Sequence, residues 1–408
     1  MATRLGPDFA KLTWASGVSN IGDGVMGAAF PLLVASLTRD PLLVAGAAFA
    51  GRLPWFLFAL ISGALADRMD RKRVLVVTDV IRAVGVGLLA LGVWTGEAGL
   101  TAVYLVAFGL GVAETFFDTS AEAFTPRLVN SEQLASANGR LQAVEWVGGS
   151  FAGPPLGALL FAVAATLPFL VDAVSFALAA LMVALIPGPH RSTRTVHGTL
   201  WGDIKEGLGW LWGQRVLRAL VLMAGVINLI TFGIISIFVL YAQDILGVVD
   251  VGYGLLLSAI GIGGLVGALV SPRIVRAIGP GNTLRYVIGS SALLTGVFPL
   301  LSDIWAAGAV LLLFGLTSTG WNVVSVSLRQ RLTPDQLRAR VAGAARLLAW
   351  GTQPVGALLG GALGAAVGLR SPFWVAAVVY IAMLALTWRI TSNQTIRAAE
   401  TAGMTASA

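Results

Sequence analysis

Long apolar stretches follow one another along this 408-residue chain, and they constrain the fold more than any other feature. Each is close to or above the roughly 20 residues that an α-helix needs to cross the hydrocarbon core of a bilayer. Only 12% of the residues are charged, and no long polar segment remains that could fold as a separate soluble domain. The sequence therefore predicts an all-α membrane protein with twelve transmembrane helices. The expected spans are 10–36, 42–66, 74–95, 101–125, 139–162, 166–187, 216–241, 251–271, 284–301, 304–326, 340–366 and 371–390.

The distribution of lysine and arginine predicts the orientation, because positively charged short loops stay on the cytoplasmic side. Of the 27 basic residues, only Arg39 and Arg370 fall in loops that follow odd-numbered spans, and Arg52 and Arg82 lie within spans. We therefore expect both termini in the cytoplasm and no cleavable signal peptide. The net charge of +7 is spread over separate short loops, so it indicates topology and not a nucleic-acid surface.

An internal repeat divides the chain into two halves. PLGALL at 155–160 recurs as PVGALL at 354–359, and GAL at 63–65 recurs at 267–269, so the offsets are close to half the chain length. Six spans per repeat preserve orientation, which predicts parallel pseudo-repeats. A short amphipathic surface helix is expected around 201–212. The expected domains are an N-terminal six-helix bundle (1–187), a cytoplasmic linker (188–215), a C-terminal six-helix bundle (216–390) and a cytoplasmic tail (391–408).

The loop after the second span carries the most specific motif. GALADRMDRKRVL at 63–75 resembles the signature G-x-L-a-D-r-x-G-r-k-x-x-l of the major facilitator superfamily of secondary transporters, with Asp70 in place of the second glycine. Phrases such as TDVIRA at 78–83 resemble the bacterial branch that contains enterobactin exporters and macrolide-efflux proteins. The resemblance covers the whole chain and implies the fold of that superfamily. It also implies a cytoplasmic gate, formed by Gly63, Asp67, Arg68, Arg71, Lys72 and Glu122.

A second motif, GGSFAGPPLG at 148–157, lies in the fifth span and resembles the antiporter signature of proton-driven drug exporters. Gly149 and Gly153 lack side chains on one helix face, which lets another helix approach closely. Pro154 removes a backbone hydrogen bond and permits a bend. The motif is thus either a gate hinge or a site of tight helix packing. The hinge candidates are Gly149, Gly153, Pro154 and Gly157. The fourth span lacks the arginine that many such exporters use in proton transfer, so the coupling mechanism stays open.

Carboxylates inside the spans are the candidates for coupling, since a charge near the bilayer centre costs about 2.5–3.5 kcal/mol on insertion scales. Glu114, Asp118 and Glu122 recur every four residues, which stacks them on one helix face. Glu122 lies near the gate loop, where a structural ion pair with an arginine is favoured. Asp23 matches Arg52 in depth, so the two form either a static salt bridge or a site for a proton or a cationic substrate. The proton-coupling candidates are Asp23, Arg52, Glu114 and Asp118.

Other polar residues within the spans are interpreted as structural contacts or as parts of the substrate pocket. Asp79 and Arg82 are three residues apart, which favours an intrahelical ion pair. Asp172 is interpreted as a structural polar contact near the outer end of the sixth span. The second half carries no acid near the midplane, so substrate contact there falls to amides and aromatic rings. The pocket candidates are Asn228, Phe232, Trp321 and Asn322.

The energy source follows from missing motifs. The sequence has no G-x-x-x-x-G-K-[ST] phosphate loop and no cysteine, and it implies no cofactor or metal. Both histidines lie in the linker, which disfavours an enzyme. We therefore predict a monomeric, proton-coupled exporter of a hydrophobic or amphipathic small molecule, such as a drug, macrolide or siderophore, in a bacterial plasma membrane. The alternatives are an importer or lipid transporter of the same fold, and, from another class, a non-transporting membrane sensor or a membrane enzyme.

Overall fold

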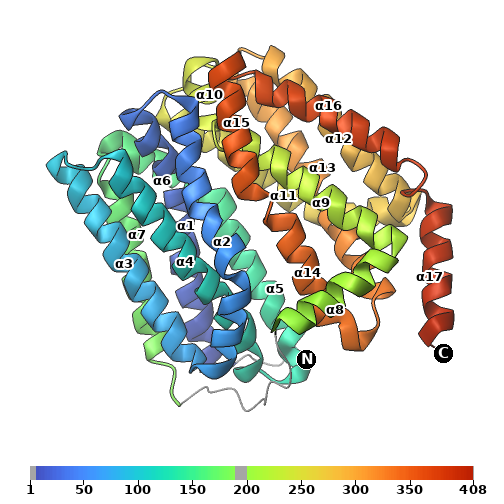
Figure 1. Ribbon diagram of the computed structural model, residues 1–408. Coiled ribbons are helices and arrows are strands. Elements are labelled where there is room, and N and C mark those ends of the chain that lie inside the picture. Colours follow the sequence, from blue (N-terminus) through green and yellow to red (C-terminus); the bar gives the residue numbers. More distant parts are fainter. Residues whose placement is uncertain (1–5, 189–199, 408) are drawn as a thin grey trace. The chain divides into compact units, whose positions relative to one another are not determined.

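The computed structural model describes residues 6–188 and 200–407, apart from scattered side chains within those ranges. The described residues form helices joined by short loops, with no β-strand among them (Figure 1). The middle of the predicted linker, including His190 and His197, lies outside the described residues.

Seven α-helices are found among the described residues 6–188. They are α1 (Pro7–Leu37), α2 (Pro41–Arg68), α3 (Arg71–Thr95), α4 (Leu100–Phe124), α5 (Leu134–Glu145), α6 (Gly153–Val163) and α7 (Leu167–Ala184). A π-helical turn, Trp146–Ala152, joins α5 to α6, so these two helices together form the predicted fifth span. π-Helical turns of this kind are frequent at functional sites.

Ten α-helices are found among the described residues from 200 onward. They are α8 (Leu200–Gly213), α9 (Arg215–Ile235), α10 (Phe238–Asp244), α11 (Asp250–Ile278), α12 (Pro280–Val297), α13 (Ile304–Leu332), α14 (Arg338–Trp350), α15 (Gln353–Val367), α16 (Ser371–Thr387) and α17 (Asn393–Ser407). The predicted surface helix at 201–212 is confirmed as α8. It is attached to α14 by an ion pair of 2.7 Å between Arg340 and Glu206.

The predicted spans coincide with these helices. Nine helical stretches of the described residues are long and apolar enough to cross a membrane, and α16 is a shorter apolar helix. The two remaining predicted spans, 284–301 and 340–366, correspond to α12 and to the interrupted pair α14 and α15. The interruption before α15 lies in the same place within its repeat as the π-helical turn before α6.

The chain divides into two compact units, one formed by 1–197 with 247–258 and the other by 198–246 with 259–408. This division passes through α11, whereas the predicted domain boundary lies in the linker. The boundaries at 187 and 215 therefore stay a prediction.

The pseudo-repeat is visible in how each unit packs. A Cβ atom on Gly157 of α6 would overlap the carbonyl oxygen of Val25 on α1, and a Cβ atom on Gly356 of α15 would overlap that of Leu229 on α9. Both glycines occupy the third position of the repeated hexapeptides. Helix backbones approach this closely only where a side chain is missing, so the same contact is built twice, once in each unit.

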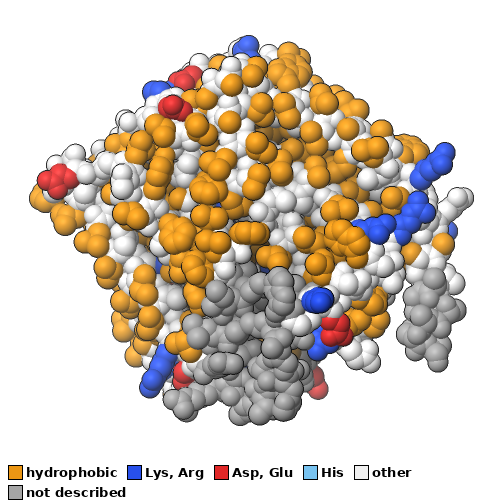
Figure 2. Space-filling model, in the orientation of Figure 1, with side chains coloured by type: hydrophobic (Ala, Val, Ile, Leu, Met, Phe, Trp, Pro, Cys, Tyr) orange, Lys and Arg blue, Asp and Glu red, His pale blue; other side chains and the backbone are white. Residues whose placement is uncertain are grey.

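Large hydrophobic side chains are exposed along the helices, as expected for surfaces that face lipid. Leu88 and Leu91 on α3 and Val378 on α16 are examples, with 63%, 51% and 65% of their surface exposed. On the face drawn in Figure 2, hydrophobic side chains dominate and most charged side chains lie near the edges. Each unit also has its own apolar core, around Leu75 and Phe124 in the first and around Leu217 and Ile288 in the second.

Candidate functional site

The first feature of the candidate site is an ion pair between α2 and α4. Arg52 Nη1 lies 3.7 Å from Glu114 Oε1, and the two side chains are 39% and 41% exposed. The helices meet closely because Gly111 of α4 faces the carbonyl oxygen of Gly51, where a Cβ atom would overlap it. Glu114 lies three residues beyond Gly111, on the same face of α4, and so it is brought to Arg52.

Asp23 lies on α1 between two glycines, and its side chain is exposed. It has no ion-pair partner among the described residues, although it lies within electrostatic range of Arg82 and Glu114. The static Asp23–Arg52 salt bridge that the sequence left open is thus absent from the described part of the chain. Equal depth in the bilayer did not fix which faces of the two helices meet.

Asp118 is one turn beyond Glu114 on α4 and is partly exposed. It lies within electrostatic range of Glu114, Arg82 and Asp23. The structure therefore brings the four proton-coupling candidates into one electrostatic neighbourhood on α1, α2 and α4, with Arg82 of α3 as a cation that the sequence had assigned elsewhere.

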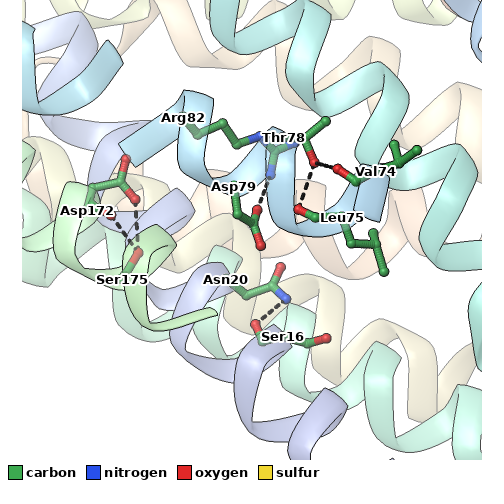
Figure 3. Close-up of polar contacts among 9 residues, drawn as sticks. All are labelled: Ser16, Asn20, Val74, Leu75, Thr78, Asp79, Arg82, Asp172 and Ser175. Carbon is green, nitrogen blue, oxygen red and sulfur yellow. Dashed lines mark hydrogen bonds and ion pairs between the residues drawn. The ribbon is translucent and has the colours of Figure 1, made fainter. Parts of the chain in front are cut away.

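Asp79 and Arg82 form a buried ion pair on α3 (Figure 3). Arg82 Nη1 lies 3.7 Å from Asp79 Oδ1, and the two side chains are 5% and 0% exposed. The guanidinium lies over the ring of Phe117 on α4 at 4.7 Å and near that of Phe176 on α7 at 5.2 Å. The predicted intrahelical pair is confirmed, and its arginine also holds α3 against two neighbouring helices.

The one residue that departs from the loop motif, Asp70, has a structural role that the sequence analysis did not predict. Asp70, which replaces the motif glycine, is the N-cap of α3 and accepts hydrogen bonds from the backbone N–H of Lys72 (3.0 Å) and Arg73 (3.3 Å). The Lys72 ammonium donates to the carbonyl oxygen of Ile186, just after α7. Arg71 is buried. The side chains of the other gate candidates, Gly63, Asp67, Arg68 and Glu122, lie outside the described residues.

The motif at 148–157 contains the π-helical turn, and Pro154 lies in the first turn of α6. A Cβ atom on Gly153 would lie 2.5 Å from the Cα of Gly24 on α1, so the two backbones touch. Gly149 has more room, since its nearest neighbour, the carbonyl oxygen of Asn20, would be 3.8 Å away. Sequence analysis missed Gly24, whose role becomes visible only once α1 is packed against α6.

The pocket candidates of the second unit differ in their surroundings. Asn228 on α9 accepts a hydrogen bond of 2.8 Å from the Gln353 amide on α15 and donates to the carbonyl oxygen of Ala224. Trp321 is buried in the apolar core, whereas Asn322 is exposed. Phe232 is partly buried on α9. Gln353, which the sequence did not single out, fixes the orientation of the Asn228 amide.

A cavity of about 40 Å³ lies in the second unit. Its lining residues are Leu217, Leu220, Val221, Ala224, Ser325, Arg329, Ala345 and Ala349. Water occupies about 30 Å³ per molecule in the liquid, and ligand pockets measure roughly 300–1,000 Å³. This cavity is therefore too small for a drug-sized molecule, and none of the four pocket candidates lines it.

Two units with helices interrupted at matching places of an internal repeat, and with charged groups inside the spans of the first unit, are typical of secondary transporters. A model of the Major Facilitator Superfamily matches residues 12–352. The chain belongs to this superfamily, so it is a membrane-embedded transporter of small molecules and not an enzyme.

Curated relatives match over most of their length. The chain is 30% identical over 395 residues to "Multidrug efflux pump Tap" of Mycolicibacterium fortuitum, which covers 91% of this chain and 92% of that protein. It is 27% identical over 377 residues to "Enterobactin exporter EntS" of Salmonella typhi, which covers 88% and 86%. The predicted resemblance to bacterial exporters of the superfamily is confirmed.

Solved structures support the fold. A bacterial homologue of the iron transporter ferroportin in an inward-facing state has a TM-score of 0.78 at 16% identity, covering 94% of this chain and 98% of that chain. The nucleoside transporter NupG has a TM-score of 0.75 at 14% identity, covering 94% and 99%. At these identities the likeness concerns the fold alone.

Proposed function

We propose that this protein exports a hydrophobic or amphipathic small molecule from a bacterial cytoplasm in exchange for protons. The observation that carries the proposal is the 30% identity with a multidrug efflux pump over 91% of the chain. The enterobactin exporter, a relative at 27% identity, supports the direction of transport and widens the substrate class to siderophores. The protein works as a monomer in the plasma membrane, with both termini in the cytoplasm.

The proton gradient is the proposed energy source, and Glu114 is the proposed coupling residue. The Arg52–Glu114 pair supports this, because both side chains are about 40% exposed and a proton can reach the carboxylate without unfolding the bundle. Protonation of Glu114 removes the charge that attracts Arg52. A conformation that contains the ion pair is then destabilised, relative to one that lacks it, by the interaction energy of the pair. At 3.7 Å Coulomb's law gives about 1 kcal/mol in water and about 4.5 kcal/mol at an effective dielectric constant of 20. A bias of about 1 kcal/mol, which is typical of an exposed ion pair, shifts a conformational equilibrium roughly fivefold, so protonation of Glu114 favours one conformation over the other.

The other acids take supporting roles in this proposal. Asp23 and Asp118 lie within electrostatic range of Glu114, so the charge of Glu114 acts on both of them. Substrate binding that displaces a proton from Glu114 would then couple the two fluxes in opposite directions, as alternating access requires.

We assign the moving parts of the transporter to the two sequence motifs, at 63–75 and 148–157. We assign the gate to Gly63, Asp67, Arg68, Arg71, Lys72 and Glu122, and the hinge to the motif that ends at Gly157. The contact of Gly153 and Gly157 with α1 supports a pivot there, since α6 can roll on the backbone of α1 without clashing side chains. Substrate contact in the second unit is assigned to Asn228, Phe232, Trp321 and Asn322.

Transport assays test the proposal. An efflux-deficient bacterial host expressing the chain is screened for resistance to a panel of drugs, and the hits are measured in inverted membrane vesicles energised with a proton gradient. An exporter accumulates the substrate inside these vesicles, and a protonophore abolishes the accumulation. Uptake into right-side-out vesicles under an inward proton gradient would instead identify an importer, and accumulation that survives the protonophore would exclude proton coupling.

A further inference from the structure

Asp172, on α7, is buried without the partners that an ionised carboxylate needs. Its side chain is 1% exposed, and its Oδ2 atom has no hydrogen-bond partner among the described residues. Its Oδ1 atom shares the single hydroxyl proton of Ser175 at 3.3 Å, and that hydroxyl donates over the shorter distance of 2.8 Å to the backbone carbonyl of Asp172 (Figure 3).

The carboxyl group faces the backbone of α1. A Cβ atom on Gly22 would overlap both Asp172 Oδ1 and Ser175 Oγ, so these atoms occupy the space that a side chain on α1 would need. Asp23 is the next residue, one step of about 100° around the helix. It lies within electrostatic range of Asp172, and it is the exposed acid of the candidate site.

Among the described residues, no cation on the helices packed against α7 forms an ion pair with Asp172. Arg82 of α3 is within electrostatic range, but it forms its ion pair with Asp79 at 3.7 Å. Lys11 of α1 and Lys72 of α3 bind the carbonyl oxygens of Leu185 and Ile186, about 20 Å along the helix from Asp172 at 1.5 Å per residue.

The remaining charges near Asp172 are negative or absent. α1 presents Asp23, α3 presents Asp79 beside Arg82, and α6 has no titratable residue in its sequence. If Asp79 and Asp172 were both ionised, one guanidinium would face two buried carboxylates. A buried charge without a partner is unfavourable, whereas a neutral carboxyl group at the same place is not.

We propose that Asp172 is a second proton-binding site, which is neutral while α1 packs against α7 and which exchanges its proton with Asp23. In the exchange, the O–H bond of Asp172 breaks, a new O–H bond forms on the Asp23 carboxylate, and the negative charge moves to Asp172. Because Arg82 is shared with Asp79, the Asp172 carboxylate is unfavourable and short-lived, and it regains a proton by the reverse transfer from Asp23. The use of this proton in transport rests on the proposed function, but its presence on Asp172 does not.

Infrared spectroscopy tests the site directly. The full-length protein is labelled with 4-¹³C-aspartate, purified into lipid nanodiscs at neutral pH, and examined for the carbonyl stretch of protonated aspartic acid. We expect a ¹³C-shifted band in the wild type that is lost in Asp172→Asn. In Asp172→Glu a band at the unlabelled position replaces it, which keeps the test valid if the asparagine variant does not fold. An unchanged band in Asp172→Asn and no new band in Asp172→Glu would show that Asp172 is ionised and would overturn the proposal.

The exchange route has its own measurement. On transfer to D₂O, the Asp172 band shifts as deuterium replaces the proton. We expect Asp23→Asn to leave the band in place and to prevent its shift on the timescale on which the wild type completes it. An equal rate in both proteins would contradict exchange through Asp23.

A matched control separates this site from the proposed coupling residue. Glu114→Gln should retain the Asp172 band in full, because the Asp172 carboxyl group lies against Gly22 of α1, whereas Glu114 is on α4. If Glu114→Gln still exports against a gradient while the Asp172 band is present, the proposed role of Glu114 fails and the second site stands. If the Asp172 band is absent while Glu114→Gln abolishes coupling, the second site fails and the proposed function stands.

Discussion

Replacing Asp79 with asparagine should destabilise the first unit strongly, although the two side chains have almost the same shape. The substitution leaves Arg82 charged, 5% exposed and without its ion-pair partner. Removing one member of a buried pair costs about 3–5 kcal/mol. Coulomb's law at 3.7 Å and an effective dielectric constant of 20 gives about 4.5 kcal/mol, in the same range. The contacts of Arg82 with Phe117 and Phe176 remain in the variant, so the loss is that of the carboxylate alone.

Thermal denaturation of the purified protein measures this effect. For a unit of this size, each kcal/mol shifts the melting temperature by about 2–4 °C, so Asp79→Asn should melt roughly 6–20 °C lower than the wild type. The double variant Asp79→Leu with Arg82→Met should recover most of this loss, because buried ion pairs are often replaced by apolar residues without cost. Asp172→Asn is the matched control and should melt close to the wild type, since on our proposal it replaces a neutral carboxyl group. A melting temperature of Asp79→Asn within about 2 °C of the wild type, or a double variant as unstable as the single one, would refute the reasoning.

Three further predictions concern the packing, the loop and the gate. Gly157→Leu should insert into the membrane but lose transport, because its side chain would collide with the α1 backbone at Val25. Gly109→Leu on α4, where an added Cβ atom meets nothing within 4 Å, is the control, and full transport by Gly157→Leu would mean that the contact is dispensable. Asp70→Ala should lower the free energy of unfolding by about 0.5–2 kcal/mol, because α3 loses its N-cap, while Asp70→Gly should lower it by only a few tenths of a kcal/mol. Thermal denaturation measures both changes, and equal losses in the two variants would exclude capping. Arg71→Ala should slow vesicle transport and leave substrate affinity within a few-fold, because a gate biases an equilibrium without touching ligand; lost binding in a folded protein would exclude the gate.

The fold could be predicted from the sequence because its signals are local. Apolar runs long enough to span a bilayer mark the helices, and the repeated hexapeptides at 155–160 and 354–359 mark the two halves. The Asp79–Arg82 pair was predictable for the same reason, since a spacing of three places both side chains on one face of a single helix. Asp70 also had a signal, because aspartate just before an apolar helical run is a common N-cap.

The Arg52–Glu114 pair could not be predicted, because it depends on how two helices meet. The sequence gives the depth of a residue in the membrane but not the direction in which its side chain points around the bundle. Depth alone favoured Asp23 as the partner of Arg52. The contact of Gly111 with the backbone at Gly51 instead fixes the faces of α2 and α4 that meet, and this requires the packed structure. The burial of Asp172 could not be predicted from the sequence for the same reason.

Proton release on substrate addition tests the central claim, that Glu114 couples proton movement to export. Purified protein in weakly buffered solution receives a saturating substrate from the resistance screen, and the pH change is recorded for the wild type, Glu114→Gln and Asp23→Asn. The account predicts release by the wild type, none from Glu114→Gln, which cannot ionise, and release of altered size from Asp23→Asn. Release from Glu114→Gln equal to that of the wild type would contradict the account.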